Sequence, residues 1–208
     1  CVSVGDEVMV GQKVGDAPAF VSAPVHASIS GRVSAVEPRI HFSGVPVMSV
    51  VIENDFNETL YWGLSPASDP DSLTPEQLSA LIREAGIVGM GGATFPTHVK
   101  ISSGLGKVDT VIVNASECEP CITSDHRVLL EHPDEVLGGV KLLARIFGVD
   151  RVHIAIEQNK ANAAGMLKLK IEEEKAPAVV DVLPTRYPQG AEKQLCQSVT
   201  GKQVPPGA

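Results

Sequence analysis

Three apolar runs separated by amphipathic stretches constrain the fold of the second half of this chain. The runs read VDTVIVN, RVHIAIE and AVVDVL, and they lie at residues 108–114, 151–157 and 178–183. The amphipathic stretches around them lie at 124–131, 134–147, 160–171 and 190–199. Strands that alternate with helices pair in parallel, because each helix returns the chain to the edge from which the next strand starts. We therefore expect an α/β domain with a mainly parallel sheet.

Residues 1 to about 60 follow another pattern, in which short Val-rich segments alternate with turn residues. The segments read EVMVGQKVG, FVSAPVHASISG, RVSAVE and VPVMSVVIE. This rhythm is typical of an all-β module. A stretch rich in Pro, Ser and Asp at 64–71 is the expected linker. The chain is therefore expected to hold two domains, 1–63 and 72–208.

A helix start is expected directly after that linker. Thr74, Pro75 and Gln77 form a capping box with proline at the first helical position. Leu78, Leu81, Ile82 and Ala85 then share one helical face, and Gly86 closes the segment.

Composition excludes several classes of protein. A net charge of −8, with five Phe, two Tyr and one Trp, argues against nucleic acid as a partner. Four scattered cysteines do not make a disulfide scaffold, which favours a reducing compartment. No run reaches the ~20 apolar residues of a membrane span, and the start CVSVGDEV lacks the regions of a signal peptide.

The stretch GMGGATFPTHVK at 89–100 is the first candidate site. Its three glycines let backbone amides approach a ligand closely, and Pro96 and Thr97 open a helical turn that favours an anion. Lys100 brings a positive charge one turn further on. These features suit a phosphate cradle, although a tight connection before a helix has the same composition. The stretch matches neither the Walker pattern nor the usual dinucleotide spacing.

The loop NASECEPCITSDHR at 114–127 is the second candidate site, because it follows an expected parallel strand, where α/β folds bind ligands. The Asn114 amide suits the mixed edge of a heteroaromatic ring, and two carboxylates further on suit ribose hydroxyls. Asp125 and Arg127 are better interpreted as capping and flanking a helix that begins near Ser124. Cys118 and Cys121 form a C-x-x-C, but no other ligand at zinc spacing accompanies them, so incidental cysteines are favoured over a metal or redox pair.

The first half resembles the lipoyl and biotinyl carrier fold, a small β barrel-sandwich. The resemblance rests on Gly-Asp-Glu-Val at 5–8, Gly-Gln-Lys-Val at 11–14, Ala-Pro-Val at 23–25 and Gly-Arg-Val at 31–33. A carrier bears its cofactor on a hairpin lysine, and residues 15–20 contain none. The module is therefore expected to dock or scaffold. Lys13 is expected to be ordinary surface, and His26 and His41 to be structural.

Taken together, GMGGATFPTHVK, NASECEPCITSDHR and YPQGAEKQL resemble the C subunit of the Rnf electron-transport complex over the whole chain. From about residue 75 they resemble, more remotely, the flavoprotein subunit of respiratory complex I. The resemblance implies a site for FMN and NADH. It assigns Gly89, Gly91, Gly92 and Lys100 to FMN, Asn114 and Ser116 to the flavin, and Glu117, Glu119 and Phe95 to the nicotinamide nucleotide. Tyr187, Gly190 and Glu192 match a third part of the pocket.

Three positions depart from the complex I pattern. Met90 stands in place of arginine, Ser116 in place of aspartate, and Ala191 in place of the first glutamate of a pair. The cysteine clusters that bind iron-sulfur centres in Rnf C subunits do not occur in this chain, which is therefore expected to be a segment of a longer protein.

The function implied by the resemblance is hydride transfer between NADH and FMN, with no side chain as catalyst and no metal held by this segment. In the family, electrons continue through iron-sulfur centres toward ferredoxin or membrane subunits, coupled to ion movement. The protein is expected at the cytoplasmic face of the cell membrane, peripheral and held by other Rnf subunits, and the segment is not expected to sustain full turnover by itself. The alternative is a non-catalytic assembly module.

Overall fold

The computed structural model describes residues 2–67, 69–90 and 93–205. Its contacts divide the chain into two units, Cys1–Ser103 (unit 1) and Gly104–Ala208 (unit 2), and each unit is described by itself. The expected domains 1–63 and 72–208 stay a prediction. Among the helices that the structure describes, none combines the length and the apolar character needed to cross a membrane.

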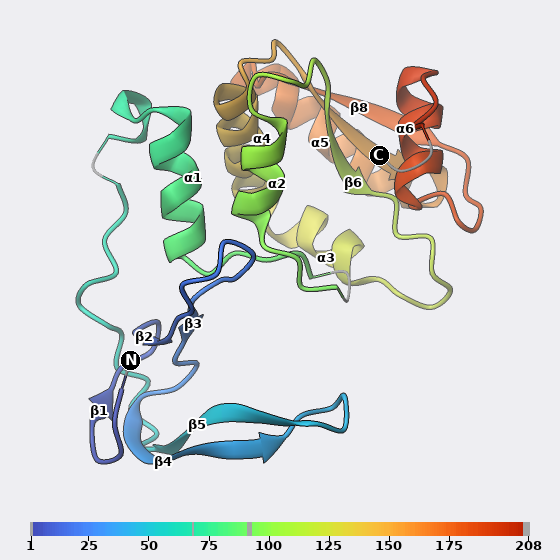
Figure 1. The fold of residues 1–208 in the computed structure, drawn as a ribbon. Coiled ribbons are helices and arrows are strands. Elements are labelled where there is room, and N and C mark those ends of the chain that lie inside the picture. The colour runs from blue at the N-terminus through green and yellow to red at the C-terminus, as the bar shows by residue number, and fades with distance from the viewer. Residues whose placement is uncertain (1, 68, 91–92, 206–208) are drawn as a thin grey trace. The chain divides into compact units, whose positions relative to one another are not determined.

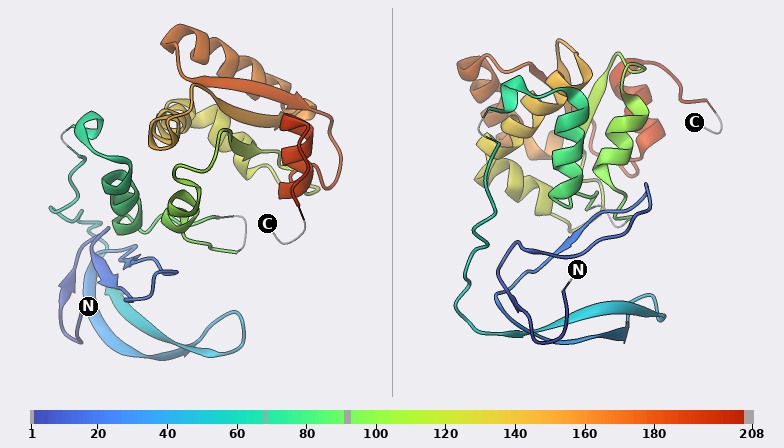
Figure 2. Two further views of the ribbon diagram at one scale, coloured as in Figure 1. Left: turned by 45° about the horizontal axis from the view of Figure 1, so that its top comes forward. Right: turned by 60° about the vertical axis from the view of Figure 1, so that its left-hand side comes forward.

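Unit 1 begins with short antiparallel strands. β1 (Glu7–Val8), β4 (Gly31–Ile40) and β5 (Pro46–Asn54) form a sheet in the order β1-β4-β5, and β2 (Lys13–Gly15) pairs with β3 (Val25–His26). Its small core consists of Val8, Val14, Ala27 and Val33. Strands β4 and β5 continue past β1 as a two-stranded ribbon (Figures 1 and 2).

Two helices and a 3-10 turn complete unit 1. They are η1 (Pro70–Ser72), α1 (Pro75–Glu84) and α2 (Thr97–Gly104). The predicted capping box of α1 is confirmed, because the Thr74 hydroxyl accepts from the Gln77 amide while the Gln77 side chain accepts from the Thr74 amide. Leu78 and Ile82 are buried, whereas Leu81 is exposed.

Unit 2 contains the predicted parallel sheet, which is confirmed. β6 (Val111–Ala115), β7 (Val152–Glu157) and β8 (Ala178–Leu183) pair in parallel in the order β6-β7-β8. The intervening elements are α3 (Ser124–Glu131), α4 (Pro133–Phe147), η2 (Gln158–Lys160) and α5 (Ala161–Glu174), and α6 (Glu192–Thr200) follows β8. The expected apolar run at 108–114 begins three residues before its strand, because Val108 is exposed outside the sheet.

Two apolar clusters lie on opposite faces of this sheet, because neighbouring residues of a strand point to opposite sides. Ile154 and Ile156 of β7 pack with Leu137 of α4 and Leu167 of α5. Ala155 packs instead with Leu183 and with Leu195 of α6, so α6 covers the second face. The sheet is therefore buried on both sides, and its ligand-accessible edge is the one where the strands end.

Candidate functional site

The carboxyl edge of the parallel sheet carries the acidic loop and the third motif. Asn114 is the next-to-last residue of β6, Glu117 follows that strand, and Glu157 is the final residue of β7. The chain after β8 returns to the same edge through Tyr187 and Gly190 before α6 begins. This is the position at which open α/β sheets bind ligands.

Gly190 joins these two motifs in one hydrogen-bonded cluster. The Asn114 side-chain amide donates to the Gly190 carbonyl at 2.9 Å, and the Gly190 amide donates to the Cys118 sulfur at 3.4 Å. The Ser116 amide donates to the Asn114 side-chain oxygen at 3.1 Å, and the Ser116 hydroxyl donates to the carbonyl of Ala155 in β7. The structure therefore brings the predicted residues 114, 116 and 190 together.

Glu117 has a structural role that the sequence did not reveal. Its carboxylate accepts from the Ser124 hydroxyl and from the amides of Asp125 and His126 at 3.1, 2.8 and 3.4 Å, and so caps α3. Thr123, at the N-cap position, makes no side-chain cap. The expectation that Asp125 caps this helix is therefore wrong, because the oxygen of a distant carboxylate fills that position. Contact of Glu117 with a nucleotide stays a prediction.

Negative charge is concentrated where α3 begins. The pKa of the Asp125 carboxyl is raised above its ordinary value, first by burial and then by the charges of Glu117 and Glu119. Glu119 is exposed, whereas Glu117 is buried with the ammonium of Lys160 3.9 Å from its carboxylate. Arg127, expected to flank the helix, forms an ion pair with Glu131 along α3.

A cavity of about 380 Å³ opens beside this cluster. It is lined by residues of three segments, among them Glu117, Glu119, Glu157, Lys160, Arg186 and Tyr187. The last of these is exposed, and Glu192 is exposed at the start of α6. Sequence reasoning missed Glu157, Lys160 and Arg186. The available signal for Glu157 was a charged residue at the end of a strand that is mostly apolar.

The glycine-rich stretch belongs to unit 1, and its central residues Gly91 and Gly92 lie outside the described residues. On either side of them the chain doubles back, since the Gly89 amide donates to the Phe95 carbonyl at 2.9 Å. Phe95 is exposed, and the ammonium of Lys100 lies 6.0 Å from the centre of its ring.

The helix predicted after this loop is confirmed as α2, but its first turn differs from the expectation. The Thr97 amide donates to the Ile87 carbonyl and the Val99 amide donates to the Pro96 carbonyl. These two amides are therefore not free for an anion. His98 is buried in the same turn with its Nε2 3.1 Å from the Phe20 carbonyl, a role that sequence reasoning missed.

The two cysteines of the C-x-x-C are free thiols that both line the cavity of unit 2. Cys118 accepts from Gly190, whereas Cys121 is exposed. Within residues 2–67, 69–90 and 93–205, no three His, Cys, Asp or Glu side chains are grouped as a metal site.

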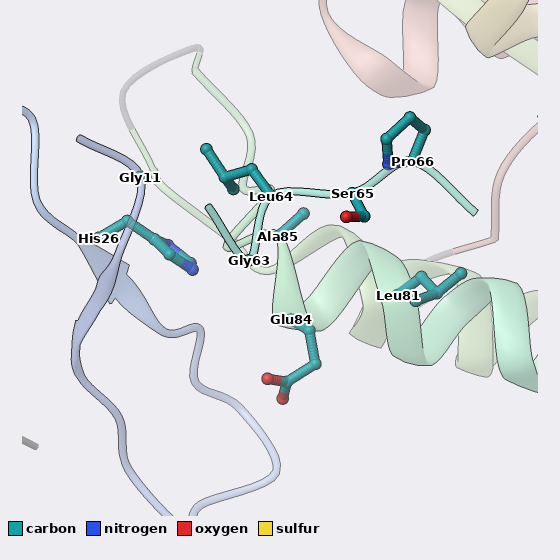
Figure 3. A pocket seen from close by; sticks show the side chains of 9 residues that line it. All are labelled: Gly11, His26, Gly63, Leu64, Ser65, Pro66, Leu81, Glu84 and Ala85. Carbon is teal, nitrogen blue, oxygen red and sulfur yellow. The ribbon is translucent and has the colours of Figure 1, made fainter. Parts of the chain in front are cut away.

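Unit 1 has a cavity of its own, of about 600 Å³, between the chain at 63–66 and α1 (Figure 3). Leu64 and Leu81 provide much of its apolar wall, and His26 and Glu84 are among its polar side chains. The Glu84 carboxylate forms an ion pair with Lys13 at 2.5 Å, so this charged group of the cavity already has a partner within the chain.

Two family models match the chain. The model of the Nuo51 FMN-binding domain matches residues 82–208, and that of the RnfC barrel sandwich hybrid domain matches residues 1–57. The barrel-sandwich and α/β fold class expected from the sequence is thereby confirmed.

Curated relatives align along the whole chain. The C subunit of a Na(+)-translocating ferredoxin:NAD(+) oxidoreductase complex from Acetobacterium woodii is 45% identical over 100% of this chain and 47% of the relative. The proton-translocating counterpart from Clostridium ljungdahlii is 42% identical over 99% of this chain and 45% of the relative. The C subunit of an ion-translocating oxidoreductase complex from Vibrio cholerae is 41% identical over 99% of this chain and 26% of the relative. The chain thus spans half the length of these relatives or less.

Solved structures share the fold. An NAD+-reducing [NiFe]-hydrogenase in the H2-reduced state superposes with a TM-score of 0.59 at 24% identity, over 70% of this chain and 29% of that one. The air-oxidized state of the hydrogenase gives a TM-score of 0.58 at 25% identity, over 69% of this chain and 28% of the other. Residues 82–208, which match the Nuo51 FMN-binding model, make up more than half of the chain, so the chain belongs to the Nuo51 FMN-binding family, and along its whole length it is similar to the C subunits of ion-translocating oxidoreductase complexes.

Proposed function

We propose that this chain binds FMN and NAD(H) and passes electrons between them, as part of the C subunit of an ion-translocating ferredoxin:NAD oxidoreductase complex. The family of the second half supports FMN as the cofactor. The names of the relatives support NAD and ferredoxin as the electron partners of the complex.

The observation that carries the proposal is the cluster at Gly190. It places the acidic loop and the third motif side by side at the carboxyl edge of the sheet, next to a cavity. One carboxylate oxygen of Glu157 at this cavity is buried without a hydrogen-bond partner among the described residues. An orphaned acceptor beside a cavity fits a ligand that is rich in hydroxyl and amide donors, which both nucleotides are.

Several side chains still have hydrogen-bond donors, acceptors or charge available for a ligand, in addition to their contacts within the chain. The Asn114 amide uses one N–H and one oxygen lone pair, so one of each remains for the polar edge of a flavin ring. Glu119 is exposed and can accept from ribose hydroxyls. In unit 1, Lys100 can neutralise a phosphate, and the accessible side of the Phe95 ring offers an aromatic surface.

The chain's task is positioning rather than acid–base or nucleophilic catalysis. Bound FMN would supply the capacity to accept a hydride and to release single electrons. Glu117 and the cluster at Gly190 hold the acidic loop and the third motif in place. Contacts of Tyr187, Glu192 and Ser116 with the flavin or the nucleotide would complete the site. Gly89, Gly91 and Gly92 would provide amides for the phosphate.

The remaining activity is proposed for the longer protein, because the relatives extend well beyond this segment. Iron-sulfur centres there would take the electrons onward to ferredoxin or membrane subunits. The assembly would lie at the cytoplasmic face of the membrane, and the present segment alone would not complete that turnover.

One observation favours the alternative of an assembly module. The end of the β4–β5 ribbon exposes a run of large apolar side chains, namely Ile40, Phe42, Val45 and Met48. Such a surface suits protein contacts. A docking surface on this ribbon is compatible with electron transfer elsewhere in the chain. The assembly module is therefore favoured only if the chain fails to bind the cofactor.

A titration of the 208-residue chain with FMN tests the proposal, followed by flavin absorbance near ~450 nm and fluorescence. Riboflavin, which lacks the phosphate, is the matched ligand. We expect FMN to bind more tightly than riboflavin, and Lys100→Gln to reduce that difference. Gly91→Val should abolish binding because a β-branched side chain blocks the loop. Lys107→Gln, an equal charge change at an exposed position, is the control. Failure of the folded wild type to bind FMN would favour the assembly module.

A further inference from the structure

Two thiols of unit 2 lie in one loop beside the cavity of about 380 Å³. Cys118 and Cys121 are both free and both line this cavity. Cys121 is exposed, whereas Cys118 is half-buried. The proposed function uses neither thiol as a reactive group, although C-x-x-C is a spacing at which two thiols exchange with a disulfide.

The backbone at Cys121 is strained. The Ile122 amide donates to the Glu119 carbonyl at 3.4 Å and closes a four-residue turn with Pro120 and Cys121 at its centre. Cys121 has a φ of 66°, a left-handed conformation that favours glycine or asparagine at the third position of a turn. Strain of this kind is concentrated at functional positions, so the side chain at 121 needs an explanation beyond the turn itself.

The same turn brings the chain at Cys121 back toward Cys118. The chain bends at Glu119 and turns at the next two residues. A disulfide needs Cα atoms about 4.4–6.8 Å apart, and residues three positions apart meet that requirement only when the chain between them is bent. The bond can therefore close by movement within this loop.

The Cys118 sulfur takes part in the cluster at Gly190. It accepts from the Gly190 amide at 3.4 Å, and its thiol donates to the Glu119 carboxylate at 4.0 Å. A disulfide has no thiol proton to donate, and a bond to Cys121 draws the sulfur toward the exposed turn. Gly190 would then keep only the hydrogen bond from Asn114 as its link to the acidic loop.

We propose that Cys118 and Cys121 form a reversible disulfide, with a low-molecular-weight disulfide as the oxidant, and that this bond weakens the binding of the flavin beside the cluster at Gly190. The second part rests on the proposed function, because it concerns the regulation of the same site. The C-x-x-C by itself favours incidental cysteines. The strained turn, the shared cavity and the bond to Gly190 favour the reversible pair, the kind of disulfide that senses redox state in a reducing compartment.

The oxidation takes two thiol–disulfide exchanges. The thiolate of the exposed Cys121 attacks the small disulfide, forms a mixed disulfide and releases one small thiolate. The Cys118 thiolate then attacks the Cys121 sulfur and releases the second small thiolate. Two electrons pass from the two cysteines to the oxidant, and the two thiol protons leave with the two small thiols. An excess of small thiol reverses both exchanges.

Equilibration of the 208-residue chain with mixtures of mercaptoethanol and its uncharged disulfide tests the pair. Acid quenching and alkylation fix the state of the thiols, and trypsin then releases residues 108–127, which contain these two cysteines and no others. Under oxidising conditions we expect this peptide to lack two hydrogen atoms and to carry no alkyl group.

Two variants serve as controls for the peptide. In Cys121→Ser we expect it to carry one alkyl group, on the half-buried Cys118. Cys196→Ser, the loss of a thiol in α6, should leave the oxidation of the peptide unchanged. A doubly alkylated peptide from the folded wild type, in a mixture that oxidises the same chain in urea, would overturn the inference.

Titration with FMN tests the effect on the flavin. Oxidised wild type should bind FMN about two- to tenfold less tightly than reduced wild type, the range that one lost hydrogen bond gives. Cys121→Ser should bind FMN equally before and after the same treatment. Unchanged FMN affinity in a chain whose peptide is fully oxidised would overturn the regulation of the site. Absence of FMN binding to the reduced wild type would overturn the proposed function and the effect on it, whereas the disulfide in the peptide would still support the reversible pair.

Discussion

A β-carbon at Gly190 would collide with the carbonyl oxygen of Ser116. The same β-carbon would also lie 3.4 Å from the Cys118 sulfur, on the side where that sulfur receives the Gly190 amide. Glycine is therefore required here by a close approach of two loops. This approach brings the third motif onto the acidic loop.

Gly190→Ala is expected to destabilise unit 2 by about 1–3 kcal/mol, because backbone atoms must move to admit the methyl group. FMN affinity should fall as well, since Asn114 would lose its fixed partner. Denaturant unfolding and flavin titration measure the two effects. Gly138→Ala is the matched control, because nothing lies within 4 Å of that β-carbon position in the exposed middle of α4. It should instead raise stability by about 0.5–1 kcal/mol. Equal unfolding of the Gly190 variant and wild type would contradict the argument.

The capping box of α1 offers a test of local stability in unit 1. Thr74→Ala should cost about 1 kcal/mol, because the Gln77 amide loses its acceptor at the helix start. Gln77→Ala should cost less, since it exposes one amide that water can reach. Because the two residues bond reciprocally, the double variant should lose less than the two single losses added together. Strict additivity in urea unfolding would argue against a coupled cap.

Glu117 and Glu119 should respond differently to the same substitution. Glu117→Gln is expected to lower the Tm, because a neutral amide replaces the charged cap that receives two backbone amides and a hydroxyl. Glu119→Gln should leave the Tm close to that of wild type, because this residue is exposed. If Glu119 holds the nucleotide as predicted, only its variant should weaken NADH binding without loss of stability. Thermal melts and NADH titration separate the two outcomes.

This pair of carboxylates also marks how far the sequence could predict the site. Both stand in one loop shortly after a strand end, and nothing in the pattern distinguishes them. The distinction arises because the loop folds back over seven residues, so that Glu117 reaches the Ser124 hydroxyl. Local capping rules examine the residue beside the helix, Thr123, and that residue makes no cap.

The strands and helices of unit 2 could be predicted because the spacing of apolar residues in the sequence matches the pattern of buried residues in the structure. β7 is apolar throughout most of its length since helices cover both faces of the sheet, and this leaves a continuous run in the sequence. The partners of α2 were not predictable. Thr97 lies at a helix start that favours anions, yet its amide bonds to Ile87, a pairing set by the return of the chain rather than by composition. Glu157 was not predicted for a similar reason, because only the tertiary structure shows that one oxygen of its buried carboxylate has no hydrogen-bond partner among the described residues.

Asp125 gives the site a measurable dependence on pH. Burial and the charges of Glu117 and Glu119 raise the pKa of its carboxyl in the folded state. The folded protein then binds this proton more tightly than the unfolded chain, where an Asp pKa is about 3.9. Stability contributed by the protonated group is therefore fully present below about pH 3.9 and is lost as pH rises through the higher folded pKa. At pH 7 the ionised carboxylate is unfavourable.

Asp125→Asn should consequently raise the Tm at pH 7, and the gain over wild type should shrink as pH falls toward 4. In a Glu119→Gln background the gain should be smaller, because one of the repelling charges is already absent. Glu76→Gln is the control at the first turn of α1, where a carboxylate stabilises the helix start, so this variant should not gain stability at pH 7. Scanning fluorimetry of these proteins across that pH range provides the measurement. A gain for Asp125→Asn that is equally large at pH 4 and pH 7 would mean that its origin is not the charge on this carboxylate.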